Sequence, residues 1–235
     1  MFNFNHDQDD ANPHPNNFCG GYSLAAIVSK LQPFEDNDPI HVYTALLPFQ
    51  NLNLNRLFRN TPNDPSPNAQ TLINGAQLQG SGTNILLPST FLAAQYAQLN
   101  YEAYLNRTTY VREATPDLPG NINADDIVDE EIATINAQGG HLNLLTVQPD
   151  EIGPSLEEFL QEDFNNNQHR YWLVLVLKGR HWVAIKRGQN GGYCIYNPGR
   201  GINAEANIAG DVIEYTDSQN IAHTDNWSGI AISVA

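Results

Sequence analysis

The sequence predicts an α+β fold, in which amino-terminal helices pack on a carboxy-terminal antiparallel sheet. Two observations predict it. Apolar residues follow helical spacing in the first part of the chain, and short apolar runs separated by glycine and asparagine turns fill the last part. Helices that come first and strands that follow are typical of α+β proteins rather than of alternating α/β proteins.

The helices are expected where apolar residues follow helical spacing after a capping residue. Residues 18–31 predict a central, buried helix, because apolar side chains cover most of its circumference and Asn16 and Asn17 stand in N-cap positions. Further helices are predicted at 89–105, 123–137 and 155–164.

The strands are expected mainly after residue 170. Residues 171–177 form an unbroken apolar run, which indicates a strand buried on both faces. Two more strands follow at 182–185 and 193–196, joined by a turn that contains an Asn-Gly pair. Other strands are predicted at 142–147, 211–215 and 229–234, and loops at 108–121 and 201–210.

A single domain with one arm and one insert is expected. Residues 1–17 are polar and rich in Asn, Asp and Pro, so they predict a flexible arm. The domain covers 18–235, and a helical insert interrupts it at about 33–135.

Composition excludes several function classes. The 235 residues carry a formal net charge of −15, which disfavours nucleic acid and anionic membrane surfaces as partners. No stretch approaches the ~18 apolar residues of a membrane helix, and the start of the chain does not resemble a Sec-type signal peptide. With two cysteines, the sequence predicts a cytoplasmic protein, or one exported without a Sec signal.

Three residues have the types needed for thiol catalysis. Cys19 is expected in the first turn of a helix, where unpaired backbone N–H groups favour a thiolate. His181 opens one predicted strand and Asn197 closes the next, so we expect the two to face each other across the ladder and hydrogen-bond. His181 would then accept the thiol proton, and Asn197 would fix the imidazole tautomer.

Neighbouring residues complete the predicted site. Gly20 and Gly21 leave space for a substrate beside the thiol, and the backbone N–H of Cys19 is a predicted oxyanion donor. Trp182 is expected to shield the His–Asn pair from water, although a tryptophan on a strand is more often a core residue.

Other interpretations of these residues stay open. Cys19 also fits a buried core thiol, and Asn197 before proline also fits an ordinary turn. His141 is a second candidate base, and Cys194 is expected to be a packing residue. No cofactor and no metal site are predicted. The acidic residues of the 123–137 helix are read as a solvated first turn: Asp125, Asp126, Asp129, Glu130 and Glu131.

Three short motifs resemble those of papain-like cysteine proteases, especially bacterial effector-type members. They are NNFCGGYSLAAI, GRHWVAIKR and CIYNPGRG, near the two ends of the chain. The resemblance implies a papain-like fold with Cys19 as nucleophile, His181 as base and Asn197 as orienting residue, in the order found in papain. It departs at Pro13, where these proteases have an oxyanion-hole glutamine, so Asn17 is the candidate second donor, with Gln8, Asn12 and Asn16 as further possibilities.

The resemblance implies a thiol hydrolase that acts on a protein amide bond, as a peptidase, a glutamine deamidase or a deubiquitinase. It further implies a bacterial effector or toxin, whose partners are a protein or peptide substrate and a protein inhibitor or immunity partner. Two alternatives remain, an inactive papain-like protein-binding module and a transglutaminase-like acyl transferase.

Overall fold

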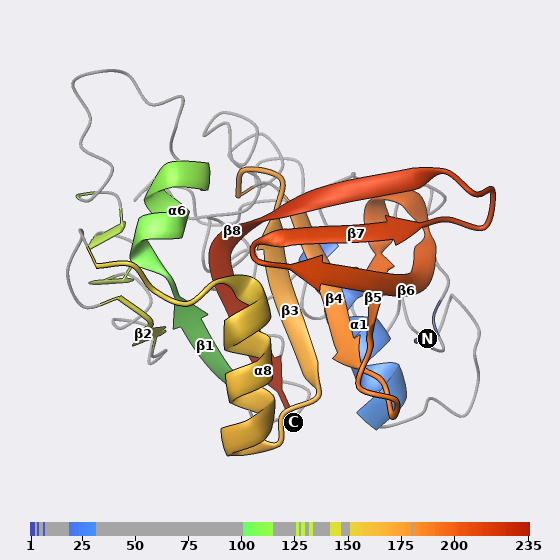
Figure 1. Cartoon of the computed structure of the whole chain (residues 1–235), viewed down its shortest axis with the longest axis horizontal. Coiled ribbons are helices and arrows are strands. Elements are labelled where there is room, and N and C mark those ends of the chain that lie inside the picture. Colours follow the sequence, from blue (N-terminus) through green and yellow to red (C-terminus); the bar gives the residue numbers. More distant parts are fainter. Residues whose placement is uncertain are drawn as a thin grey trace, which may run out of the picture.

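The computed structural model describes residues 1–2, 4, 7, 19–31, 101–114, 126, 128–129, 132–133, 142–146, 151–179 and 181–235. Their elements follow the chain in this order (Figure 1): α1 (Cys19–Leu31), β1 (Tyr101–Leu105), α6 (Arg107–Ala114), β2 (Leu142–Leu144), α8 (Leu156–Asn167), β3 (Tyr171–Val176), β4 (His181–Arg187), β5 (Tyr193–Asn197), the 3-10 turn η2 (Pro198–Arg200), β6 (Ile202–Ala209), β7 (Val212–Thr216) and β8 (Ala222–Val234).

Six strands of the described part, β3 to β8, close into a barrel. The strand order is β2-β1-β8-β3-β4-β5-β6-β7, and β7 pairs again with β8 (Figure 1). Each neighbouring pair in the barrel is antiparallel. The long strand β8 makes closure possible, because residues 222–226 pair with β7 whereas Trp227 and residues 231–234 pair with β3.

The predicted papain-like α+β fold, with amino-terminal helices packed on an antiparallel sheet, is wrong. The described chain is organised around a six-stranded barrel, and β1 and β2 extend it as a parallel pair. Closure depends on the pairing of β7 with β8. Hydrophobic periodicity reports which face of a strand is buried but not which strands pair, so it does not distinguish a barrel from an open sheet.

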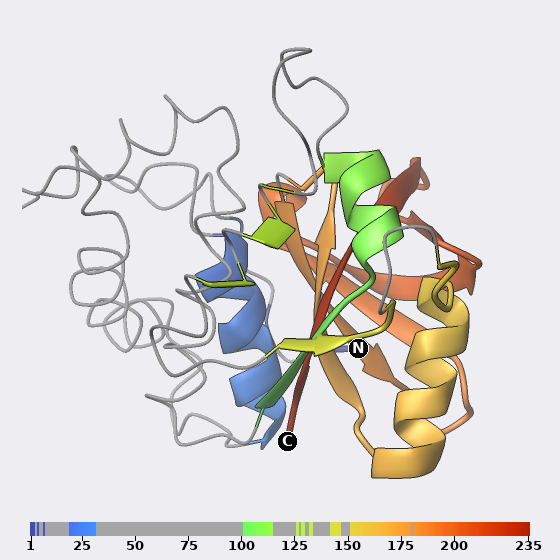
Figure 2. The ribbon, with the colours of Figure 1, turned by 90° about the vertical axis from the view of Figure 1, so that its left-hand side faces the viewer.

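Two apolar clusters lie on the two faces of the barrel wall. The interior cluster includes Val183 and Ile195, and α8 adds Leu156 and Leu160 to it. The exterior cluster lies between the strands and α1. Figure 2 shows α1 and α8 on opposite sides of the strands. Because successive residues of a strand point to opposite faces, β3 needs apolar residues at every position, which explains its unbroken apolar run.

Several predicted elements are confirmed. The strands at 171–177, 182–185, 193–196, 211–215 and 229–234 correspond to β3, β4, β5, β7 and the end of β8, and the strand at 142–147 corresponds to the shorter β2. The helix at 155–164 corresponds to α8, which begins with a capping box between Ser155 and Glu158.

Three segments differ from their predicted structure. Residues 101–105 form β1 instead of the end of a helix, and residues 107–114 form α6 within a predicted loop. Residues 202–209 form β6 instead of a loop. The inward positions of β6 include Ala204. Since alanine has a low strand propensity, the alternation of this segment is easily overlooked.

The arm and the insert are described only in part. Within the predicted arm 1–17, Phe2 and Phe4 are buried and pack against Tyr196. Residues 8–18 lie outside the described residues, as do residues 32–100 of the predicted insert 33–135. The extent of the helical insert therefore stays a prediction.

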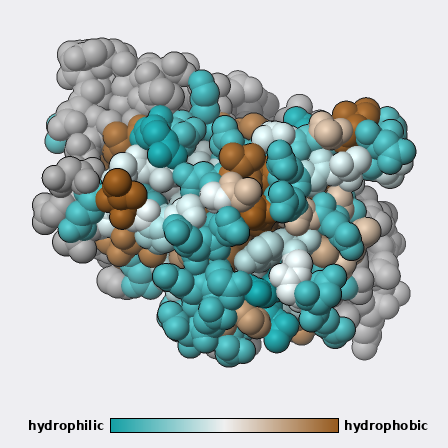
Figure 3. Space-filling view, in the orientation of Figure 1, coloured by the Kyte–Doolittle hydropathy of each residue, from teal (hydrophilic) through white to brown (hydrophobic). Residues whose placement is uncertain are grey.

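The surface is mainly hydrophilic on the face shown in Figure 3, where apolar side chains form small separate patches. Large apolar side chains that are exposed in the described part are Met1, Leu144, Ile152, Leu177 and Ile221. Among the described helices, none is both long and apolar enough to cross a membrane.

Candidate active site

Cys19 is the first residue of α1, and its thiol lies against the start of β4. Its Sγ accepts a hydrogen bond from the backbone N–H of Trp182 at 3.4 Å. One turn later, Ser23 Oγ donates to the carbonyl of Trp182 at 3.0 Å. The β4–β5 ladder ends at Ala184 and Tyr196, so the start of β4 extends beyond its partner and is available to α1. The first turn of α1 is thereby fixed above β4.

His181 and Asn197 form a buried hydrogen-bonded pair. His181 Nε2 lies 2.8 Å from Asn197 Oδ1. The sequence suggested that the two residues lie directly opposite each other, but in the structure they do not. The register of Ala184 with Tyr196 places them two residues out of step on the same face, a diagonal that these side chains span.

The contact with Asn197 fixes the imidazole tautomer. Asn197 Oδ1 also accepts the backbone N–H of Gly199 at 3.1 Å, and its Nδ2 donates to Tyr215 Oη at 2.8 Å. With Oδ1 as the acceptor, His181 Nε2 carries the proton and Nδ1 is left to interact with Cys19. This is the arrangement in which an imidazole removes a proton from a thiol.

Of the interactions that raise the pKa of His181, those with Cys19 are the largest. Burial alone lowers the pKa of His181, but attraction to the Cys19 sulfur and a hydrogen bond with it raise the pKa. The hydrogen bond with Asn197 and the charge of Asp225 act in the same direction, and the net pKa lies above the ordinary value for histidine. The surroundings therefore favour the protonated form of the His181 imidazole.

Tyr215 and Asp225 are site residues that the sequence did not indicate. Asp225 Oδ2 accepts from Tyr215 Oη at 2.7 Å and from Asn197 Nδ2 at 3.3 Å. Burial, followed by the hydrogen bond to Asp225, raises the pKa of Tyr215. Both residues lie on late strands, where tyrosine is common, and Asp225 lies before the strand predicted at 229–234. Only the pairing of β7 with β8 brings them to the end of β5.

The remaining predicted site residues are distributed around this group. Gly20 and Gly21 lie in the first turn of α1, next to Cys19, and Gly20 is buried. Trp182 is fully buried and packs in the exterior cluster with Cys19, on the face of β4 opposite to that of His181, and its shielding of the His–Asn pair stays a prediction. Asn17, the candidate second oxyanion donor, and His141, the second candidate base, lie outside the described residues.

Comparison with known proteins gives no identification. No protein-family model, no curated protein and no solved structure matches the chain. The relationship to papain-like cysteine proteases stays a prediction from the three motifs. The second cysteine, Cys194, is a free thiol buried in β5.

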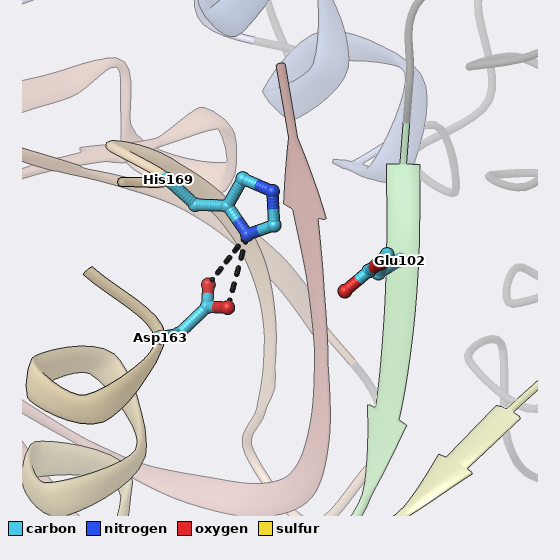
Figure 4. A group of neighbouring side chains, drawn as sticks. All are labelled: Glu102, Asp163 and His169. Carbon is cyan, nitrogen blue, oxygen red and sulfur yellow. Dashed lines mark hydrogen bonds and ion pairs between the residues drawn. The ribbon is translucent and has the colours of Figure 1, made fainter. Parts of the chain in front are cut away.

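A second group of chemically capable side chains lies between β1 and α8. The carboxylates of Glu102 and Asp163 and the ring of His169 turn toward one another (Figure 4), within the reach of a single metal ion. Asp163 is already satisfied, however. It accepts from Trp172 Nε1 at 2.6 Å and lies 2.9 Å from His169 Nδ1. Asn167 Nδ2 also donates to it, and Tyr104 Oη lies 3.1 Å away but shares its one proton with the nearer Glu102 carboxylate.

The hydrogen bonds to the Asp163 carboxylate argue against a metal site. A carboxylate offers about four lone-pair positions, and the donors around Asp163 occupy most of them. A metal ion would have to displace donors that already satisfy a buried carboxylate. We therefore interpret Glu102, Asp163 and His169 as part of a hydrogen-bonded junction that joins α8 to the strands.

Proposed function

We propose that the chain is a cysteine hydrolase that cleaves or deamidates an amide bond of a protein substrate. Cys19 is the nucleophile, His181 the general base and acid, and Asn197 the residue that orients the imidazole. The observation that carries the proposal is the 2.8 Å contact of His181 with Asn197, on an imidazole whose pKa is raised by Cys19.

The reaction proceeds in two steps. His181 takes the proton of Cys19, and the thiolate attacks the amide carbon. The imidazolium then protonates the departing nitrogen, so that the C–N bond breaks and a thioester remains. In the second step His181 removes a proton from water, the hydroxide displaces the thiol, and a carboxylic acid is released. The backbone N–H of Cys19, at the start of α1, is the proposed donor to the carbonyl oxygen.

The substrate class and the biological role rest on the motif resemblance. On that ground the reaction is peptide cleavage, glutamine deamidation or removal of ubiquitin, and the setting is that of a bacterial effector or toxin with a protein inhibitor or immunity partner. The location that goes with this role is the cytoplasm or export without a Sec signal. The resemblance does not require the papain-like fold, because the same three side chains act on unrelated folds.

A second candidate function is protein binding without catalysis. It is favoured by the burial of Cys19, which is 3% exposed and accepts a backbone N–H from Trp182. A thiol held in this way resembles a structural cysteine, whereas reactive thiols are usually partly exposed. The two candidates differ in the reactivity of one atom, which makes them easy to separate.

The deciding experiment is brief alkylation by iodoacetamide at about pH 6, where an ordinary thiol is almost fully protonated. Peptide mapping separates the label on Cys19 from the label on Cys194, which is an internal control in the same molecule. We expect rapid labelling of Cys19 in wild type, and labelling at least about tenfold slower in His181→Ala. Equally slow labelling of both cysteines in wild type would favour the binding module.

Acyl transfer is tested in the same material. An acyl transferase accepts a primary amine in place of water at the thioester, so the substrate gains the mass of the amine. A hydrolase gives the carboxylic acid whether or not amine is present. Because Cys19→Ala lacks the nucleophile, it is the negative control for both reactions.

A further inference from the structure

Asp225 is buried at the far end of a hydrogen-bonded chain that begins at the proposed base. The chain runs from His181 to Asn197 and from there to Asp225, both directly and through Tyr215. It crosses from β4 through β5 and β7 to β8. Asp225 is 1% exposed, so its charge is not screened by water.

The carboxylate decides which way the Asn197 amide points. As observed, the NH2 group of Asn197 faces the oxygens of Tyr215 and Asp225, and the carbonyl oxygen faces His181. A flipped amide would turn its oxygen toward the carboxylate, acceptor against acceptor. It would also turn its NH2 group toward the backbone N–H of Gly199, donor against donor. Only the observed orientation lets Asn197 accept from His181.

Asp225 also lacks a full set of partners. Within the described part of the chain, its Oδ1 atom is buried and makes no hydrogen bond. An unsatisfied buried oxygen destabilises a fold, and an amide at the same place would carry less charge. We interpret this cost as a sign that the site needs the charge of a carboxylate at this position.

We propose that Asp225, together with Tyr215, is a positioning element of the site, which orients Asn197 and supplies the negative charge that stabilises the His181 imidazolium. The inference rests on the proposed function, since it assigns these residues to the same site. Neither residue touches the thiol, so both act through Asn197. The site then consists of five side chains, Cys19, His181, Asn197, Tyr215 and Asp225, instead of the three that the motifs indicate.

Other charged or titratable groups surround this chain. Cys19 approaches His181 from α1, and Arg200, on the turn after β5, lowers the pKa of Tyr215 in opposition to Asp225. His223 stacks on Tyr215 with ring centroids 5.3 Å apart. Among the carboxylates of the described residues, Asp225 raises the pKa of His181. Its removal is therefore expected to move the His181 titration in one direction.

The test compares wild type with Asp225→Asn, using two readouts. One is the rate of Cys19 alkylation by iodoacetamide at about pH 6, and the other is a pH titration of the His181 ring by NMR. We expect alkylation to slow by roughly tenfold, because less of the site is present as the ion pair. We also expect His181 to lose its proton at lower pH. Glu214→Gln is the matched control, since this exposed carboxylate adjoins Tyr215 in sequence and contacts Asn207.

Wild-type behaviour of Asp225→Asn in both readouts would overturn the proposal. If Asp225→Asn does not fold, as judged by circular dichroism, Tyr215→Phe is used to test the proposal. It keeps the carboxylate but removes the closer acceptor of Asn197, so alkylation should slow severalfold and His181 should titrate at lower pH. Unchanged behaviour of Tyr215→Phe would then overturn the proposal.

Failure of the proposed function has a different signature. If wild-type Cys19 is itself slow to alkylate, the site is not a thiol hydrolase. The His181 titration does not depend on that reaction. A shift in Asp225→Asn would still support the positioning role, and the absence of a shift would overturn it.

Discussion

The backbone N–H of Trp182 donates to the sulfur of Cys19, although the two residues are 163 positions apart in the sequence. The carbonyl of the same residue accepts from Ser23, one turn further along α1. One peptide segment of β4 therefore holds the helix at two points. The position of the thiol relative to His181 follows from this docking, since His181 immediately precedes Trp182 in β4.

The docking leads to a first prediction. Ser23→Ala removes the buried donor to the Trp182 carbonyl, and we expect the free energy of unfolding to fall by about 1–3 kcal/mol. Chemical denaturation measures it. Ser218→Ala, at an exposed position between β7 and β8, is the control and should change stability by less than about 0.5 kcal/mol. Equal effects of the two substitutions would contradict the docking role of Ser23.

Gly229 supplies a second prediction. It has a φ of +83°, and an added Cβ would lie 2.7 Å from the carbonyl oxygen of Asn106 and even nearer to the backbone of Tyr110. Gly229→Ala should therefore destabilise the protein by about 3 kcal/mol or more. Gly210 has a φ of +58° with open space around it, so Gly210→Ala should cost only about 1 kcal/mol. A melting-temperature comparison of the two variants separates steric conflict from backbone strain.

The junction at Asp163 supplies a third. In Asp163→Asn, the new NH2 group would face donors such as Trp172 Nε1, and we expect a loss of about 2–4 kcal/mol. Glu162→Gln, the exposed neighbour, should be nearly neutral. Since the Asp163 oxygens are occupied, we also expect zinc or a chelator to leave the wild-type melting temperature unchanged. A zinc-dependent rise in melting temperature that is lost in Asp163→Asn would refute the structural interpretation.

The first turn of α8 supplies a fourth prediction, on pH. Hydrogen bonds from the Ser155 backbone and side chain lower the pKa of Glu158 in the folded state. A carboxyl with a depressed folded-state pKa stabilises the fold above its unfolded pKa of ~4.3, and this contribution is lost as the pH falls through the lower, folded-state value. The stability advantage of wild type over Glu158→Gln should therefore shrink in acid. Ser218→Ala, an exposed substitution that leaves every carboxylate in place, is the control and should keep the wild-type dependence on pH.

The strands that the sequence predicted are those with a burial pattern strong enough to read locally. β3 is apolar at every position because both of its faces are covered. In β6, alternation is carried partly by Ala204 and Ala206, which give a weak signal. The sequence pattern of a single strand does not indicate that the barrel closes, because closure depends on which strands pair.

The residues of the candidate site also fall into two groups, those that the sequence predicted and those that it did not. Cys19, His181 and Asn197 have residue types and element positions that suggest thiol chemistry before any coordinates are known. Tyr215 and Asp225 do not, because tyrosine is common on strands and Asp225 lies before the strand predicted at 229–234. Only the pairing that returns β8 to β7 brings Asp225 near Asn197, a contact across 28 positions of the sequence.

The pairing of β8 with β1, β3 and β7 has a consequence for the time at which activity can arise. Contacts between distant segments form slowly, and a chain emerges from the ribosome residue by residue. The barrel cannot close until residues 222–234 have been made, long after the thiol-bearing helix has left the ribosome. We therefore expect the proposed reactivity of Cys19 to be absent from the nascent chain until synthesis has passed β8.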